Sequence, residues 1–343
     1  MTFLGNCRAT GIGSLAATDV GEAVASVFAD CPDLPYWPQL PNVSVAEGMN
    51  EQASAGLPGL VKEEKRLRIV QDEGFYLGVE RLLAACDTGD ASAAALAPEA
   101  AAAFEPFIRQ VTSRATPEAK GQIAGPVTVG MAILGEDGNP ILYDDVLREV
   151  LVKFLHLRVR WQAERIAAAG ARPVVFVDEP SLASFGTPFF GWGKEQVQET
   201  LGAVASGAET VGSHCCSNTD WPILLGCREV SIVSFDAFGF ADNFLIYRDD
   251  IAAFLGRGGT IAWGIAPTDP EAAAAATVES LRERLLREVE KVEALGFARD
   301  QVLRQSLITP ACGLGTRDAD TARRAFAMVH DLAASLRAEY LGL

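Results

Sequence analysis

Continuous apolar runs that end in polar residues recur along this chain. The clearest is Pro173 to Val177, which is followed at once by the carboxylates of Asp178 and Glu179. An apolar run of this length is typical of a strand that is buried on both faces of a parallel sheet. With the other runs it predicts eight strands, at about residues 10–15, 35–41, 121–129, 173–180, 209–214, 229–236, 260–267 and 306–312.

Segments with helical spacing separate these runs. Thr18 and Asp19 form a candidate cap for the first helix, and the three prolines within 35–41 exclude a helix there. The Ala-rich residues 90–104 are expected to form helix pieces on the outside, and a short helix is expected after residue 218. The remaining predicted helices cover about residues 18–30, 45–56, 62–87, 143–169, 194–206, 247–256, 270–295 and 318–338.

Eight strand-and-helix units over 343 residues predict an α/β protein, a single (β/α)8 TIM barrel that spans residues 1–343. An open, doubly wound sheet is the alternative. No glycine-rich nucleotide fingerprint follows any of the predicted strands, so a nucleotide-binding fold has no support.

Polar side chains gather where the predicted strands end. In a TIM barrel the chemistry lies at the carboxyl ends of the strands, so these residues are the candidate site. They are Ser14, Gln39, Thr128, Asp178, Glu179, His214, Cys216, Asp236, Thr268 and Cys312.

His214 and Cys216 lie two residues apart on a predicted strand and therefore point the same way, while Cys215 points to the other face. An imidazole and a thiolate that converge in this way supply two zinc ligands, and Cys312 offers a third. The alternative is that these cysteines are small buried hydrophobic residues and that the spacing arose by chance.

The composition of the chain argues against some classes of binding partner. The chain carries 29 Lys and Arg against 45 Asp and Glu, a net charge of −16, which disfavours binding to nucleic acid or to an anionic membrane. The basic stretch 62–68 is expected to be the exposed face of a helix. Seven cysteines without regular spacing, no leader pattern and no long uncharged run predict a cytoplasmic protein.

Five segments resemble the catalytic half of cobalamin-independent methionine synthase, in the same order and with similar spacing. The resemblance covers about residues 9–340, and the zinc motif also resembles that of the corrinoid:coenzyme M methyltransferases of the same superfamily. Uroporphyrinogen decarboxylase belongs there too, but metal ligands would have no role in it. The segments are Ile12-Gly13-Ser14, Gly125 to Thr128, Val177 to Pro180, His214-x-Cys216 and Pro310 to Arg317.

The resemblance implies a zinc-dependent methyltransferase that converts homocysteine to methionine, with zinc on His214, Cys216 and Cys312. It further implies that Asp178 or Glu179 pairs with the ammonium of homocysteine, and that the Ser14 hydroxyl and the backbone of Ile12 and Gly13 bind its carboxylate. A bound metal deprotonates a thiol, which fits this chemistry.

Three departures from the family pattern are visible. The family's fourth ligand is a glutamate, whose nearest replacement here is Asp236, as a ligand or in a substrate role. Gln39 stands where the family has an acidic residue, and Thr268 stands near the place of a family histidine.

The chain shows no counterpart of the N-terminal half that helps the full-size enzyme to hold its folate donor. It resembles the short core methionine synthases, which implies a methylcorrinoid or a corrinoid protein as the methyl donor. Two alternatives remain: another small thiol acceptor such as coenzyme M, or a barrel that binds a corrinoid or tetrapyrrole without turnover.

Overall fold

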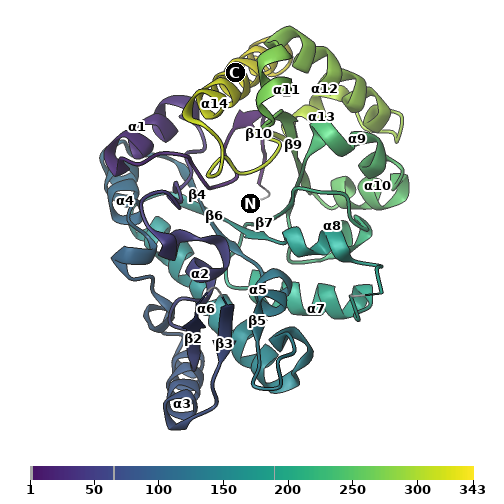
Figure 1. Ribbon diagram of the computed structural model, residues 1–343. Coiled ribbons are helices and arrows are strands. Elements are labelled where there is room, and N and C mark those ends of the chain that lie inside the picture. The colour runs from purple at the N-terminus through teal and green to yellow at the C-terminus, as the bar shows by residue number, and fades with distance from the viewer. Residues whose placement is uncertain (1–2, 65, 189) are drawn as a thin grey trace.

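A parallel sheet of seven strands forms the centre of the computed structural model, which describes residues 3–64, 66–188 and 190–343. The strand order is β1-β10-β9-β8-β7-β6-β4, and every neighbouring pair is parallel. Figure 1 shows the sheet curled inside a ring of helices. The strands are β1 (Arg8–Ala9), β4 (Glu118–Ala124), β6 (Arg172–Asp178), β7 (Val211–Cys215), β8 (Ile232–Phe235), β9 (Thr260–Ala266) and β10 (Ser306–Pro310).

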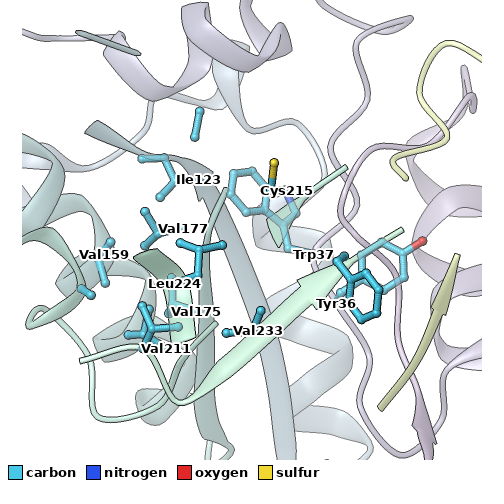
Figure 2. Packing of buried hydrophobic residues seen from close by; sticks show 14 of the residues in the cluster. Tyr36, Trp37, Ile123, Val159, Val175, Val177, Val211, Cys215, Leu224 and Val233 are labelled. Carbon is cyan, nitrogen blue, oxygen red and sulfur yellow. The ribbon is translucent and has the colours of Figure 1, made fainter. Parts of the chain in front are cut away.

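Strand β6 is buried on both faces, as its apolar run predicts. Val174 and Phe176 belong to a small cluster inside the curl of the sheet, while Val175 and Val177 belong to the large core beneath the helices. Figure 2 shows Val175 and Val177 beside Val211 of the next strand. The alternation of side chains along a strand therefore supplies both cores from one segment.

The sheet is not laddered between β1 and β4. Residues 10–15 and 35–41, here called the bridging segments, lie in this gap and form only isolated bridges, Ser14 with Gln39 and Tyr36 with Lys120. Proline has no N–H to donate, and the second segment contains three prolines, so a continuous ladder cannot form there. The central sheet thus has seven strands among the described residues and not the predicted eight, and a closed barrel stays a prediction.

Helices follow most of the strands and cover the outside of the sheet (Figure 1). Asp19 caps the first helix, as expected, by accepting a hydrogen bond from the N–H of Glu22. The larger helices are α1 (Val20–Asp30), α2 (Met49–Ser54), α3 (Glu73–Thr88), α4 (Phe104–Ser113), α5 (Pro126–Ala132), α6 (Asp145–Ala168), α7 (Lys194–Ala205), α8 (Pro222–Gly226), α9 (Ala237–Leu245), α10 (Arg248–Gly256), α11 (Pro270–Ala275), α12 (Val278–Glu293), α13 (Arg299–Arg304) and α14 (Ala319–Leu336).

Short helical turns complete the connections: η1 (Val45–Glu47), η2 (Ala91–Ala94), η3 (Pro98–Ala100), η4 (Ile141–Tyr143), η5 (Pro180–Ser184) and η6 (Arg337–Leu341). Within the described residues, we find no helix with the length and apolar character that a membrane crossing requires.

The predicted helix over 62–87 is wrong in its first part. Strands β2 (Leu60–Glu63) and β3 (Arg66–Ile69) pair antiparallel, and β5 (Ile133–Leu134) joins β3 in a second, small sheet. Leu67 and Ile69 are buried while Arg66 is exposed, which is the two-residue period of a strand. The basic stretch 62–68 therefore lies on this sheet, and the helix begins only after the Asp72 cap.

The predicted strand 121–129 is displaced toward the N-terminus. Strand β4 ends at Ala124, and Pro126 opens helix α5, where its fixed φ and missing N–H suit the first helical position. Thr128 therefore lies on a helix and does not end a strand. The single helix expected over 270–295 is also divided, because Thr277 caps a separate helix α12.

Candidate metal and substrate site

Three potential metal ligands converge at the carboxyl ends of β7 and β10. One ligand atom each from His214, Cys216 and Cys312 lies within 4.8 Å of the other two. His214 is on β7, Cys216 directly follows that strand, and Cys312 follows β10. Cys215 lies in the hydrophobic core, as the alternation predicts (Figure 2). The fold thus brings together residues that are almost 100 positions apart.

One nitrogen of His214 is free to bind a metal. Nδ1 lies 2.9 Å from the Ser234 hydroxyl, which fixes the ring, and Nε2 is buried without a hydrogen-bond partner among the described residues. A buried polar atom without a partner costs about 1–3 kcal/mol, so such an atom calls for an explanation. An imidazole held at one nitrogen with the other facing two thiols has the donor set of a zinc site.

The two thiols affect each other's ionisation. The neighbouring Cys312 side chain lowers the pKa of Cys216. The neighbouring Cys216 side chain, together with burial, raises the pKa of Cys312 to about 12, while His214 acts to lower it. Cys216 is therefore the thiol that loses its proton more readily, and thiolates are the form in which cysteines bind metals.

A cavity of about 330 Å³ opens beside these ligands. It is lined by seven residues that the sequence singled out, together with residues of η1, α2 and the loop after β10. Gly13, Glu179, Asp236 and Thr268 are not among the lining residues. The predicted residues that do line the cavity are Ile12, Ser14, Gln39, Asp178, His214, Cys216 and Cys312.

Asp178 ends β6 with its carboxyl group buried against the cavity. Its Oδ1 has no hydrogen-bond partner among the described residues. Burial raises the pKa of Asp178 to about 6, although His214 and Lys120 both act to lower it. A carboxyl oxygen that is buried and free beside a cavity is suited to accept a bond from a ligand.

Glu179 makes its hydrogen bonds with a neighbouring helix. Its carboxylate accepts hydrogen bonds from the N–H of Val127 at 2.9 Å, and from the N–H and hydroxyl of Thr128 at 2.8 and 2.6 Å. These are groups of the first turn of α5, so the side chain caps that helix from a neighbouring strand. Burial raises the pKa of Glu179 to about 7. Both oxygens of Glu179 thus accept hydrogen bonds from α5, whereas Oδ1 of Asp178 has no partner among the described residues.

Ser14 joins two walls of the cavity. It pairs with Gln39 through the backbone, and its hydroxyl accepts a hydrogen bond from the N–H of Gly315 at 3.1 Å. A Cβ on Gly313 would lie 2.5 Å from the Ser14 oxygen, and a Cβ on Gly315 would lie 2.8 Å from its Cβ. The glycines after β10 are thus required for this close approach.

Asp236 and Thr268 lie near the ends of β8 and β9 but outside the cavity lining. The Asp236 carboxylate caps α9 by accepting from the N–H of Gly239 at 2.6 Å. Burial raises its pKa, while His214 acts to lower it. Asp236 is not part of the group of three ligand atoms, and its role as a fourth ligand stays a prediction.

Sequence reasoning missed four residues around the cavity. Glu47 and Met49 line it from η1 and α2, and Glu47 also accepts bonds from the N–H groups of Leu40 and Ala102. Lys120 and Gln122 lie on β4, and Lys120 bonds to the backbone of Ile12, which lines the cavity. A lysine and a glutamine that lie two residues apart on a strand share one face of it. This spacing was the sequence feature that could have identified Lys120 and Gln122.

Two comparisons with known proteins agree with the resemblance in the sequence. Residues 88–335 match the family model described as "Cobalamin-independent synthase, Catalytic domain". A B12-independent methionine synthase from Shewanella sp. W3-18-1, solved in complex with selenomethionine, is similar with a TM-score of 0.58 and 16% identity over 98% of this chain and 99% of that one.

A putative vitamin-B12 independent methionine synthase from Listeria monocytogenes is similar with a TM-score of 0.54 and 15% identity, over 93% of this chain and 86% of that one. At these identities the likeness shows the fold. No curated protein sequence matches the chain significantly. The family description, cobalamin-independent, argues against the methylcorrinoid donor and the corrinoid-protein partner expected from the sequence.

Proposed function

Because the chain belongs to the family of cobalamin-independent synthase catalytic domains, and is thus a methionine synthase-like methyltransferase, we propose that it methylates the thiol of homocysteine to give methionine. The reaction breaks the thiol S–H bond, releases its proton to solvent, and forms a bond between sulfur and the methyl carbon. The bond between that carbon and the donor breaks, and its electron pair stays with the donor. A corrinoid donor is not part of this proposal, because the family is described as cobalamin-independent.

The observation that carries the proposal is the buried, unpartnered Nε2 of His214 beside the thiols of Cys216 and Cys312. In our proposal these three side chains hold zinc. The bound metal would leave a position for a substrate thiol and lower its pKa, so that it reacts as the thiolate. Ser234 keeps the His214 ring in the orientation that presents Nε2 to the metal.

Asp178 would recognise the amino group of the substrate. Asp178 lines the cavity that His214, Cys216 and Cys312 also line, and its Oδ1 has no partner among the described residues. No lysine or arginine is among the described lining residues. A carboxylate pairs with an ammonium, whereas a sulfonate such as that of coenzyme M would require a cation in its place. The cavity charge therefore favours an amino-acid thiol as the acceptor.

The test is metal analysis of the chain beside Cys312→Ser, with Cys86→Ser as a control, because Cys86 is a similarly half-buried cysteine on α3. We expect about one zinc per chain in the parent and the control and much less in Cys312→Ser. Homocysteine should add one sulfur neighbour to the zinc X-ray absorption spectrum.

Methionine formation is then measured with methylfolate and methylcobalamin as separate donors. If zinc is present but gains no sulfur neighbour when homocysteine is added, the assignment of homocysteine as the methyl acceptor is wrong. Zinc with bound homocysteine but no product from any donor would leave a binding protein. A chain without zinc would overturn the whole proposal.

A further inference from the structure

Lys120 occupies an unusual position in the interior of the curled sheet. It is fully buried, and its Nζ lies 4.4 Å from the centroid of the Phe176 ring, which belongs to the apolar cluster inside the sheet. The interior of such a sheet is ordinarily filled by branched apolar side chains. Burying an ammonium group is costly unless its hydrogen bonds are satisfied, so the contacts of this side chain should explain its presence.

The ammonium donates hydrogen bonds to two neutral oxygens. Nζ donates to the backbone oxygen of Ile12 at 2.7 Å and to Oε1 of Gln122 at 3.0 Å. Burial lowers the pKa of Lys120 to about 8, while Asp178 acts to raise it. The group is therefore still largely protonated at neutral pH and keeps its donors.

These contacts reach both bridging segments. Ile12 belongs to the first bridging segment. Gln122 extends the hydrogen-bond network to the second segment, because its Nε2 donates to the backbone oxygen of Trp37 at 2.7 Å. The backbone of Lys120 also donates to Pro35 and accepts from Trp37. One side chain and its neighbour thus link β4 to the two segments that lack a continuous ladder.

The same segments form one wall of the cavity. Ile12 and Ser14 of the first and Gln39 of the second line it, and so does Ala124, which lies on the same face of β4 as Lys120 and Gln122. The position of that wall relative to Asp178 therefore depends on what holds the segments to β4.

We propose that Lys120 is a positioning residue of the site, whose ammonium holds residues 10–15 and 35–41 against β4 so that the cavity fits its amino-acid ligand. The naming of that ligand as homocysteine rests on the proposed function. Lys120 itself need not touch the ligand, and it takes no part in the chemical step.

The first test compares the parent chain with Lys120→Met, which keeps the length of the side chain and removes the ammonium. We expect KM for homocysteine to rise by about tenfold, while kcat changes by less than about twofold and the zinc content stays the same. An unchanged KM, or a loss confined to kcat, would overturn the inference.

Arg257→Met is the control for this substitution. The Arg257 guanidinium also donates to backbone oxygens, including those of Cys227 and Val230, but it does not line the cavity. It should lower stability without raising KM. If KM rose equally in both variants, general destabilisation would explain the effect and Lys120 would lose its assigned role.

A second test needs no substrate, so it separates this inference from the proposed function. The N–H of Leu15 donates to Gln39, and the N–H of Gln39 donates to Gly13. In Lys120→Met these two amides should exchange hydrogen at least about tenfold faster, while the amides of β8 and β9 keep their rates. Unchanged exchange at Leu15 and Gln39 would overturn the inference, even if the parent chain proved not to bind homocysteine.

Gln122→Leu covers the case in which Lys120→Met does not fold. It removes one acceptor of the ammonium and the bond to Trp37, and it leaves the charge in place. The same two amides should again exchange faster, by a smaller factor. Exchange at the parent rate in this variant would count against the proposed role.

Discussion

Strands β6, β7, β8 and β9 are joined by parallel ladders, whereas the bridging segments reach β4 and each other through single bridges. The laddered side carries His214 and Asp178 at its strand ends. The bridged side carries Ser14 and Gln39 and depends on side chains such as Lys120 and on close contacts of glycine. Both sides border one cavity.

The difference separates two requirements of a site of this kind. Groups that hold a metal must keep their geometry within a few tenths of an ångström, and a ladder between buried strands gives that rigidity. A wall that recognises a substrate tolerates adjustment, and contacts made by individual side chains allow it. Substitutions on the laddered side should therefore affect stability or metal binding, and those on the bridged side should affect substrate affinity.

The largest expected effect is on the laddered side, at Phe235. This buried ring stacks on Phe244 at 4.2 Å between centroids and lies 5.4 Å from Trp221. Phe235→Ala should lower the free energy of unfolding by about 4 kcal/mol, because it leaves a cavity among packed rings. Urea unfolding measures it, and a loss below about 1 kcal/mol would contradict the view that this side depends on packing.

The second effect depends on pH and concerns Glu179, whose pKa is raised by burial to about 7 from an ordinary value of 4.5. The native chain therefore binds this proton more tightly than the unfolded chain. The stability that this bound proton contributes is complete below pH 4.5 and is lost as the pH rises through 7. The loss in free energy of unfolding is on the order of 3 kcal/mol in the metal-free chain.

Glu179→Gln should remove this part of the pH dependence. Asp178 titrates in the same direction in both proteins, so the comparison isolates Glu179. Urea unfolding at pH 5 and pH 8 gives, for the metal-free parent and for the metal-free variant, the difference in free energy of unfolding between the two pH values. Equal differences in the parent and the variant would show that Glu179 does not take up the proton.

The third effect is on the bridged side, at Gly13. A Cβ there would lie 2.5 Å from Oε1 of Gln39 and 2.8 Å from Cγ of Gln122, whose amide is held by Lys120 and Trp37. Gly13→Ala should cost about 2 kcal/mol of stability and raise KM for homocysteine, because the wall must move. Calorimetry and steady-state kinetics check it. A rise in KM of the same size in Phe235→Ala would remove the distinction between the two sides.

The smallest effect is at Ser234, on the laddered side. Ser234→Ala removes the contact that orients the His214 ring and should weaken zinc binding by about tenfold, with little change in stability. Competition with a chromogenic chelator measures the affinity. Ser231→Ala is the matched control, since Ser231 directly precedes β8 and its hydroxyl donates to the backbone oxygen of Val211. Equal zinc affinity in the two variants would contradict the orienting role.

The laddered side could be predicted from the sequence because its signals are local. Runs such as Val174 to Val177 place strand β6 directly, and the two-residue spacing of His214 and Cys216 puts both on one side. The place of Cys312 after the last predicted strand marked it as a third ligand, and the resemblance to a known family supported that choice. The fold brings the ligand atoms of all three residues together.

The bridged side could not be predicted in the same way, because its contacts join residues that are far apart in sequence. The donors to the Glu179 carboxylate are about 50 positions away on α5, and the Lys120 ammonium bonds to a backbone oxygen 108 positions away. The sequence marked Glu179 as a substrate residue because it follows a strand. The helix start at Pro126 instead supplies the N–H groups that occupy its oxygens.

The pairing of β1 with β10 has a consequence for the order of events during synthesis. Cys7 and Thr10 bond to Ser306 and Ile308, and Ser14 bonds to Gly315, 301 positions later. At about 5–20 residues per second, translation takes roughly 15–60 s to supply that partner. The nascent chain therefore holds His214 and Cys216 before Cys312 exists, and the first bridging segment waits unpaired. The cavity, whose walls come from both ends of the chain, is thus one of the last features to form.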